Sequence, residues 1–240
     1  VSSRQSVIRQ YDHEVQGGSV IKPLMGVKQN GPTDAGVLYP HLQSKKAIAV
    51  SCGMAPLLSQ FDPYLMAQCS VDEAVRNAVA VGADPDQMAV IDNFCWPDPV
   101  NGSDAKQKMA ALVRTCYGLH DAAVALEAPL VSGKDSMKND YRGKRAGQPV
   151  EISVPPTLLM TAVARVTDIK HARTADFKRP GDPIYLLGPG KFGLMGSEFQ
   201  ALKTPRGTFV IEERAVSYAP SIAALTGIGT VTCWRHRETL

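Results

Sequence analysis

Pro129-Leu-Val-Ser-Gly-Lys-Asp-Ser-Met-Lys-Asn-Asp140 is the stretch around which the chain is organised. It begins with the apolar pair Leu130-Val131 and breaks at Gly133, and six of the seven residues that follow are polar or charged. Glycine lets a backbone approach a ligand, neighbouring amide groups can bind an anion, and Lys134 adds positive charge. The stretch therefore predicts a strand that ends in a ligand-facing turn. An ordinary polar surface turn is an equally good interpretation.

Segments of strand length alternate with helical patterns along the chain. Asp62-Pro-Tyr64 has the N-cap residue and the proline of a helix start, and the pattern stays helical to Val81, followed by Gly82 as C-cap. Residues 103–127 form the longest helical pattern. The main strand candidates are 46–52, which Gly53 ends, then 86–92, and the very apolar 157–166, which is expected to be central in a sheet. This alternation predicts an α/β fold, a mixed sheet with helices packed on it.

A charged segment without apolar periodicity, residues 168–179, predicts a domain boundary. Beyond it we expect a strand at 184–187, a helix at 197–203 and another at 214–225. Gly188, Gly190 and Gly193 satisfy G-x-G-x-x-G, but no acidic residue about 20 positions later completes a dinucleotide site. Packing and a phosphate-side loop are comparable explanations for these glycines. Residues 138–150 are polar and are predicted to form a mobile loop.

Composition excludes several classes of protein. The 240 residues suffice for one large domain, or for one domain and part of another. A net charge of +3, from 26 basic and 23 acidic residues, is too small to indicate a nucleic-acid or membrane partner. Five cysteines without C-x-x-C spacing favour a reducing compartment over disulfides or zinc, and neither a leader nor a long apolar run is visible. We expect a cytoplasmic protein that is either cut from something longer or processed, because Val1 is not an initiator methionine.

Glu73 and Asn77 are the most suggestive polar pair. Their i, i+4 spacing places them on one helix face among small apolar residues, where a carboxylate and an amide need a partner. A hard cation such as Mg²⁺ would serve, with Asp34 as a third ligand. Two other interpretations remain open: Ser70-x-x-Glu73 fits a capping box at an inner helix start, or the pair faces solvent.

Asp92 ends a predicted strand, and ligands commonly bind at such ends, although Asp-Asn also forms ordinary turns. Gly133-Lys134 is not a P-loop. Ala128 stands where the first glycine would be, and Asp135 replaces the hydroxyl residue that should follow the lysine. A Walker-type kinase is therefore disfavoured.

Five motifs together resemble one family. In order they are Arg9-Gln-Tyr-Asp-His-Glu-Val-Gln-Gly17, Gly31-Pro-Thr-Asp-Ala-Gly36, Asp72-Glu-Ala-Val-Arg-Asn-Ala-Val-Ala-Val-Gly-Ala83, Val90-Ile-Asp-Asn-Phe94 and Ser132-Gly-Lys-Asp-Ser-Met-Lys-Asn-Asp140. Their order and spacing over residues 1–200 resemble the second half of the phosphoribosylformylglycinamidine synthase family, which is similar to the aminoimidazole ribonucleotide synthetase superfamily. Several motifs in register are far more specific than any single one.

The resemblance implies a PurM-like fold in two parts. Residues 1–172 are expected to form the second N-type domain, and residues 176–240 the beginning of a C-type α/β domain. That second domain would be incomplete, because the family's Asp-x-Ser-Asp-Gly-Gly motif is absent.

The resemblance also implies a reaction, an ATP-dependent conversion of formylglycinamide ribonucleotide to formylglycinamidine ribonucleotide in purine biosynthesis. ATP phosphorylates the formamide oxygen, and ammonia from glutamine displaces phosphate. Expected partners are the first half of the synthetase, a glutaminase domain or subunit, and a second copy in a homodimer. The catalytic histidine of the family lies in the first half, so this chain alone is expected to be inactive.

Matched motif by motif, the resemblance assigns roles to individual residues. Those expected to contact ATP are Asp92, Gly133, Lys134 and Thr33, and Ser136 is expected to contact the substrate. Asp34, Glu73 and Asn77 match Mg²⁺ ligands of a second nucleotide site, often regarded as structural, which would hold ATP or ADP. Lys134 stands where small forms of the enzyme have a Mg²⁺-binding asparagine, and a cation there would instead pair with phosphate.

The same resemblance leaves two alternatives. The chain is either part of an active site or a non-catalytic nucleotide-binding scaffold of the same enzyme. Another superfamily member, such as a selenophosphate synthetase or a thiamine-phosphate kinase, fits the Gly-Lys-Asp-Ser-Met run less well.

Overall fold

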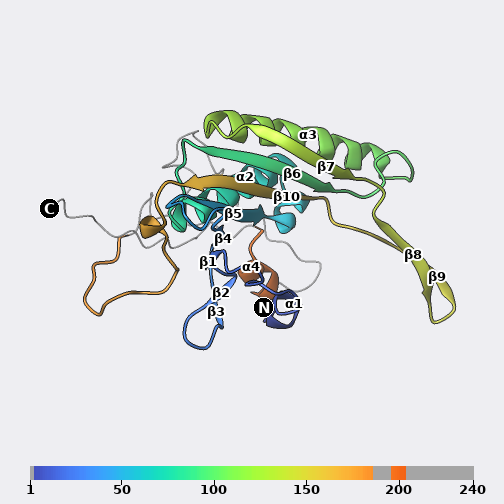
Figure 1. Cartoon of the computed structure of the whole chain (residues 1–240). Coiled ribbons are helices and arrows are strands. Elements are labelled where there is room, and N and C mark those ends of the chain that lie inside the picture. The colour runs from blue at the N-terminus through green and yellow to red at the C-terminus, as the bar shows by residue number, and fades with distance from the viewer. Residues whose placement is uncertain (1–2, 186–195, 204–240) are drawn as a thin grey trace.

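The computed structural model of the chain describes residues 3–185 and 196–203. Its main feature is a six-stranded mixed sheet in the order β1-β4-β5-β10-β6-β7 (Figure 1). All neighbouring strands are antiparallel except β6 and β7, which are parallel. The strands are β1 Ser19–Ile21, β4 Ala35–Leu38, β5 Ala47–Met54, β10 Thr157–Val166, β6 Met88–Cys95 and β7 Leu130–Ser136. The prediction of a mixed α/β sheet is confirmed.

β10 lies in the interior of this sheet, as its apolar sequence predicts. It alternates strictly between half-buried and buried residues, so that Leu158, Met160 and Ala162 face the same covered side. β5 has the same alternation and buries every second residue. One face of the sheet is therefore covered, and the other is more open.

Two long helices form the covering layer. α2 (Pro63–Ala80) packs on β5 and β10, and α3 (Ala105–Ala125) packs beside α2. The Asp62 carboxylate caps α2 by accepting hydrogen bonds from the amides of Tyr64 and Leu65, as predicted. Gly82, with φ +100°, follows the helix end.

β5 continues through Gly53 to Met54, so the predicted strand end at residue 52 was two residues too early. A Cβ atom at Gly53 would lie 2.1 Å from the Ser70 carbonyl oxygen and 2.5 Å from the Ala74 nitrogen. Only a residue without a side chain allows α2 to approach β5 so closely.

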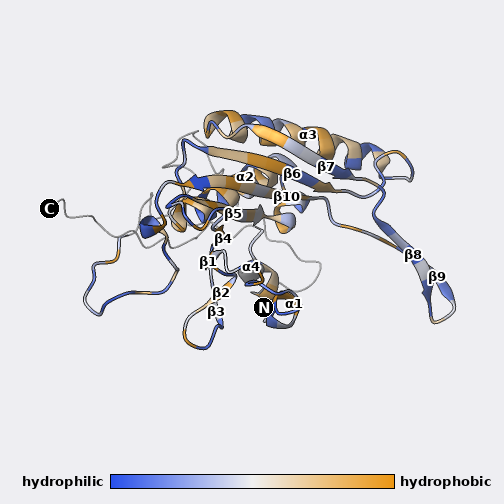
Figure 2. Cartoon of the chain, in the orientation of Figure 1, coloured by the Kyte–Doolittle hydropathy of each residue, from blue (hydrophilic) through white to orange (hydrophobic). Residues whose placement is uncertain are grey.

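Residues 140–153 form a hairpin of β8 (Asp140–Arg145) and β9 (Gln148–Ser153), which projects from the body of the molecule (Figure 1). The prediction of a mobile loop over 138–150 was wrong. Its largely hydrophilic sequence, visible in Figure 2, suggested a loop. The two strands nevertheless pair from Asp140–Ser153 to Arg145–Gln148, and Ala146 and Gly147 have the positive φ angles of a tight hairpin turn. Trp96, among the largest fully buried side chains, lies near the base of this hairpin and donates from Nε1 to the Lys108 carbonyl in α3.

The remaining elements are short. They are α1 Gln5–Ile8, β2 Leu24–Met25, β3 Gly31–Pro32, the 3₁₀ turns Pro56–Gln60 and Ile169–His171, and α4 Glu198–Lys203. α4 agrees with the helix predicted at 197–203. Of the strand predicted at 184–187, residues 184–185 have no regular structure, and the rest lies outside the described residues. Gly188, Gly190, Gly193 and the helix predicted at 214–225 also lie outside them.

Within the described ranges, none of the helices combines the length and the apolar character needed to cross a membrane.

Candidate functional site

Glu73 and Asn77 point from α2 onto the end of β5. Glu73 Oε2 accepts a hydrogen bond of 2.7 Å from the Met54 amide, and Asn77 Nδ2 donates one of 2.9 Å to the Cys52 carbonyl. The pairing of β5 with β4 stops at Ala35–Ser51, and the Glu73 and Asn77 side chains bind the β5 backbone beyond that point. Glu73 is half-buried, and burial raises the pKa of its carboxyl.

The two alternative explanations for this pair are therefore wrong. α2 begins at Pro63, and Ser70 lies in its middle with its hydroxyl donating to the Met66 carbonyl, so no capping box exists there. Neither Glu73 nor Asn77 is fully exposed to solvent.

Asp34 lies at the same end of the sheet. It immediately precedes β4, and extending the Ala35–Ser51 register by one residue places it beside Cys52, whose side chain is on the open face, opposite α2. In the part of the chain that the structure describes, Asp34, Glu73 Oε1 and Asn77 Oδ1 accept no hydrogen bond. These are two carboxylates and an amide, the oxygen donors that Mg²⁺ prefers, and a cation would offset the cost of the half-buried Glu73 carboxylate.

Thr33 shapes the turn before Asp34. Its hydroxyl donates a hydrogen bond of 2.6 Å to the Lys22 carbonyl, and its amide donates to the Pro23 carbonyl. The hydroxyl is thus already engaged by the protein backbone. Its predicted contact with a nucleotide stays a prediction.

Asp92 and Gly133 form a second group on the neighbouring strands β6 and β7. The strands continue to Cys95 and Ser136, so the predictions that Asp92 ends its strand and that the chain turns at Gly133 were wrong. Asp92 and Gly133 are register partners, and a Cβ atom at Gly133 would lie 2.4 Å from Asp92 Oδ1. Glycine is therefore required for the Asp92 carboxylate to lie over β7. Asp92 pairs with the buried Met160, so it belongs to the helix-covered face. Burial, followed by the nearby Asp135 carboxylate, raises the pKa of Asp92.

Lys134 and Ser136 point to the opposite face. The register partner of Lys134 is Asn93, and that of Ser136 is Cys95. Because side chains alternate along a strand, Asn93 and Cys95 face the side opposite to Asp92. The Lys134 ammonium donates a hydrogen bond to the Ser136 hydroxyl. The residues expected to bind ATP are therefore divided between the two faces of β7. Because β7 is an edge strand, a ligand at its free edge can reach both.

The two groups lie at the same end of the sheet. Leu159 of β10 pairs with Met54 on one side and with Asn93 on the other. The Asp34, Glu73 and Asn77 group and the Asp92 to Ser136 group are thus separated by one strand. Sequence reasoning did not identify Asp135, or the backbone groups of Cys52 and Met54 that hold Asn77 and Glu73. The glycine inside the β5 pattern was the available signal for the latter.

Gly133→Ala is expected to lower the pKa of Asp92 towards its ordinary value. The new methyl group would push the carboxylate away from β7 and into solvent, while stability should change little because Gly133 is exposed. Titration of the Asp92 carboxyl by NMR measures this shift. Ser132→Ala, on the same exposed strand but away from Asp92, should leave that titration unchanged. An unaltered Asp92 pKa in Gly133→Ala would contradict the close approach.

The chain is similar in sequence to a known family and to two PurL subunits. The family model described as AIR synthase related protein, N-terminal domain, matches residues 32–165. The chain is 34% identical over 204 residues to the phosphoribosylformylglycinamidine synthase subunit PurL of Picrophilus torridus, covering 85% of this chain and 26% of that protein. It is likewise 34% identical over 213 residues to the PurL subunit of Gloeobacter violaceus, covering 84% and 25%. The chain thus spans about a quarter of the length of these relatives.

Solved structures agree on the fold. The structure of PurLQS from Thermotoga maritima superposes with a TM-score of 0.54 at 23% identity, covering 74% of this chain and 25% of that one. T. maritima PurL complexed with AMPPCP gives a TM-score of 0.50 at 26% identity, with coverage of 74% and 26%. The PurL complex with ADP matches equally well.

Proposed function

Because this chain belongs to the family of AIR synthase related proteins, we propose that it is part of a phosphoribosylformylglycinamidine synthase. The intact ligase would convert formylglycinamide ribonucleotide, ATP and glutamine-derived ammonia into formylglycinamidine ribonucleotide in purine biosynthesis, in the cytoplasm. The observation that carries this proposal is the gathering of Asp34, Glu73, Asn77, Asp92 and Ser136 at one end of a sheet of the family's fold. T. maritima PurL, 26% identical, has been solved with AMPPCP and with ADP, which supports nucleotide binding here.

The proposed domain division follows the family. Residues 1–172 would form the N-type domain, and the match over residues 32–165 falls inside that range. Residues 176–240 would begin the C-type domain.

Each candidate residue has a proposed role. Asp92, Gly133 and Lys134 would contact the nucleotide from the edge of β7, with Thr33 beside the second nucleotide site, and Ser136 would contact the substrate. Asp34, Glu73 and Asn77 would hold Mg²⁺, which neutralises phosphate charge when it is bound. Because Asp92 and Lys134 lie on opposite faces of the sheet, they would contact different parts of the bound molecules.

The proposed partners are the rest of the synthase and a glutaminase domain or subunit. The open face of the sheet suits a partner domain, since Ile48 and Met54 of β5 are exposed there. Without that domain, the same face would favour a homodimer.

A second candidate function is a nucleotide-binding scaffold without a catalytic role. Glu73 and Asn77 favour it because both bind the β5 backbone and so belong to the packing of α2 on the sheet. A nucleotide and cation held there would also stabilise the fold.

Calorimetry with Mg-ATP separates these functions. Glu73→Gln retains an oxygen for the Met54 amide but removes the charge, so we expect it to weaken binding at the second site by at least about tenfold. Asp92→Asn tests the β7 site in the same way, and Glu151→Gln, an exposed hairpin carboxylate, is the control. Loss in Glu73→Gln alone favours the scaffold, and loss in both variants favours two sites. If neither variant changes binding, both site assignments are wrong.

A further inference from the structure

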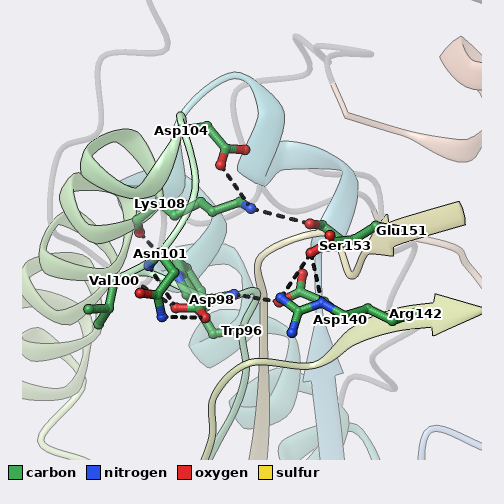
Figure 3. A network of polar contacts seen from close by, with 10 residues as sticks. All are labelled: Trp96, Asp98, Val100, Asn101, Asp104, Lys108, Asp140, Arg142, Glu151 and Ser153. Carbon is green, nitrogen blue, oxygen red and sulfur yellow. Dashed lines mark hydrogen bonds and ion pairs between the residues drawn. The ribbon is translucent and has the colours of Figure 1, made fainter. Parts of the chain in front are cut away.

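The turn that follows β7, residues 136–140, is hydrogen-bonded to the loop that follows β6, residues 96–101. The Trp96 amide donates to the Ser136 carbonyl at 2.8 Å, and the Asn139 amide donates to the Trp96 carbonyl at 3.0 Å. The Asp98 amide donates to Asp140 Oδ2 at 2.9 Å (Figure 3). Three backbone groups of the loop therefore hold the beginning, the middle and the end of the turn.

This loop is itself rigidly built. The Asp98 side chain is buried, and Oδ1 accepts hydrogen bonds from the amides of Val100 and Asn101 while Oδ2 accepts from Asn101 Nδ2 (Figure 3). The Asn101 side chain first, and then the Val100 amide, lower the pKa of Asp98 to about 2. Its carboxylate stays ionised at any working pH. The indole of Trp96 ties the same loop to α3.

The turn holds a strained residue. Lys138 has φ +61°, in the left-handed region that a residue with a side chain avoids. Such a conformation persists only where surrounding contacts impose it, and it commonly marks a functional site. The Lys138 ammonium lies 3.8 Å from Asp98 Oδ2, too long and too exposed to impose the conformation alone.

Asn139 supplies the remaining contact. Its Nδ2 donates a hydrogen bond of 2.7 Å to the Ser136 carbonyl, which also accepts from Trp96. The Ser136 backbone is thus fixed by two donors, and its hydroxyl accepts from the Lys134 ammonium on the open face of the sheet. The direction of the Ser136 hydroxyl therefore depends on this turn, on the loop that binds it and on Lys134 of β7.

We propose that Asn139 is a positioning residue, which fixes the turn after β7 so that the Ser136 hydroxyl and the Lys134 ammonium face the ligand together. This inference rests on the proposed function, in which Ser136 contacts the ribonucleotide. The strain at Lys138 is the consequence of closing the turn onto Ser136, and the Lys138 charge is not what the site requires.

Two variants of the complete chain test this role. Asn139→Ala removes the donor at an exposed position and should leave the melting temperature nearly unchanged. It should accelerate hydrogen exchange of the Trp96 amide about fivefold, the factor that corresponds to one lost hydrogen bond. It should also weaken binding of formylglycinamide ribonucleotide about tenfold, because small misplacements of a contact group are costly. Lys138→Gly should preserve both properties, since glycine adopts φ +61° without strain.

Arg145→Gln is the matched control, because it removes an exposed cation at the far end of the adjoining hairpin, away from the turn. Unchanged exchange at Trp96 in Asn139→Ala would overturn the positioning role. Equal loss of affinity in Lys138→Gly and Asn139→Ala would also overturn it, since the charge would then be the cause. If the unmodified chain does not bind the ribonucleotide, the proposed function fails for this chain, and the exchange measurement decides the role of Asn139 alone.

Discussion

Gly53→Ala is expected to lower the free energy of unfolding by about 3 kcal/mol, at the upper end of the range for overpacked cores. The added methyl group would meet two backbone atoms, the Ser70 carbonyl oxygen at 2.1 Å and the Ala74 nitrogen at 2.5 Å. Neither can rotate away as a side chain would, so α2 must shift as a body from β5. The shift would also stretch the hydrogen bond between the Met54 amide and Glu73.

Denaturant unfolding followed by circular dichroism measures this effect. Gly36→Ala is the matched control on the adjacent strand β4, where a Cβ atom would have no neighbour closer than 3.9 Å. We expect that control to be neutral or slightly stabilising, because alanine restricts the unfolded chain. If the two variants had equal midpoints, the close approach of α2 to β5 would be contradicted.

Gly53 also shows why the sequence predicts the helices and strands more accurately than the points at which they end. The apolar runs of β5, β6 and β10 and the caps of α2 are local signals, and these four elements are present. A glycine after an apolar run predicts a strand end by the same local logic. Here it marks contact with a helix that begins ten residues later, which no local pattern reveals.

The candidate site divides in the same way. The i, i+4 spacing of Glu73 and Asn77 correctly predicts one shared helix face, because helix geometry is local. Their backbone partners on β5 lie just beyond the first residue of β4, and the pairing of two strands is not a local property of the sequence. Likewise, adjacent residues of a strand point to opposite faces, yet the covered face was unknown before the helices were placed. The sequence also predicted a turn at Gly133, so the placement of Gly133 and Lys134 on opposite faces of one strand required the structure.

Arg76→Met is expected to destabilise the fold, and more strongly at pH 8 than at pH 5. Arg76 Nε donates to Asp72 Oδ2 at 2.7 Å, and the two side chains are only 19% and 12% exposed. Burial raises the pKa of Asp72 to about 7, although Arg76 opposes that rise. Without Arg76, Asp72 must either stay protonated or remain as a buried charge without its partner. The second state costs about 3 kcal/mol.

The direction of the pH dependence follows from the raised pKa. In the unfolded chain an aspartate has a pKa of about 3.9, so between roughly pH 4 and 7 the folded state binds more protons at Asp72. Stability from this group is fully present below pH 4 and is lost as the pH rises through about 7. Arg76→Met raises the folded pKa further, so its cost stays small at pH 5 and grows at pH 8.

Replacing both partners tests this reasoning, because it separates the ion pair from the packing. In Asp72→Leu/Arg76→Met, two apolar side chains fill the space without a buried charge, and stability should equal or exceed that of the unmodified chain. The loss of stability between pH 5 and pH 8 should also shrink, since its titrating group is gone. Chemical denaturation at the two pH values measures both effects. A double variant as unstable as Arg76→Met at pH 8 would show that the pair stabilises α2 directly, and the desolvation argument would then be wrong.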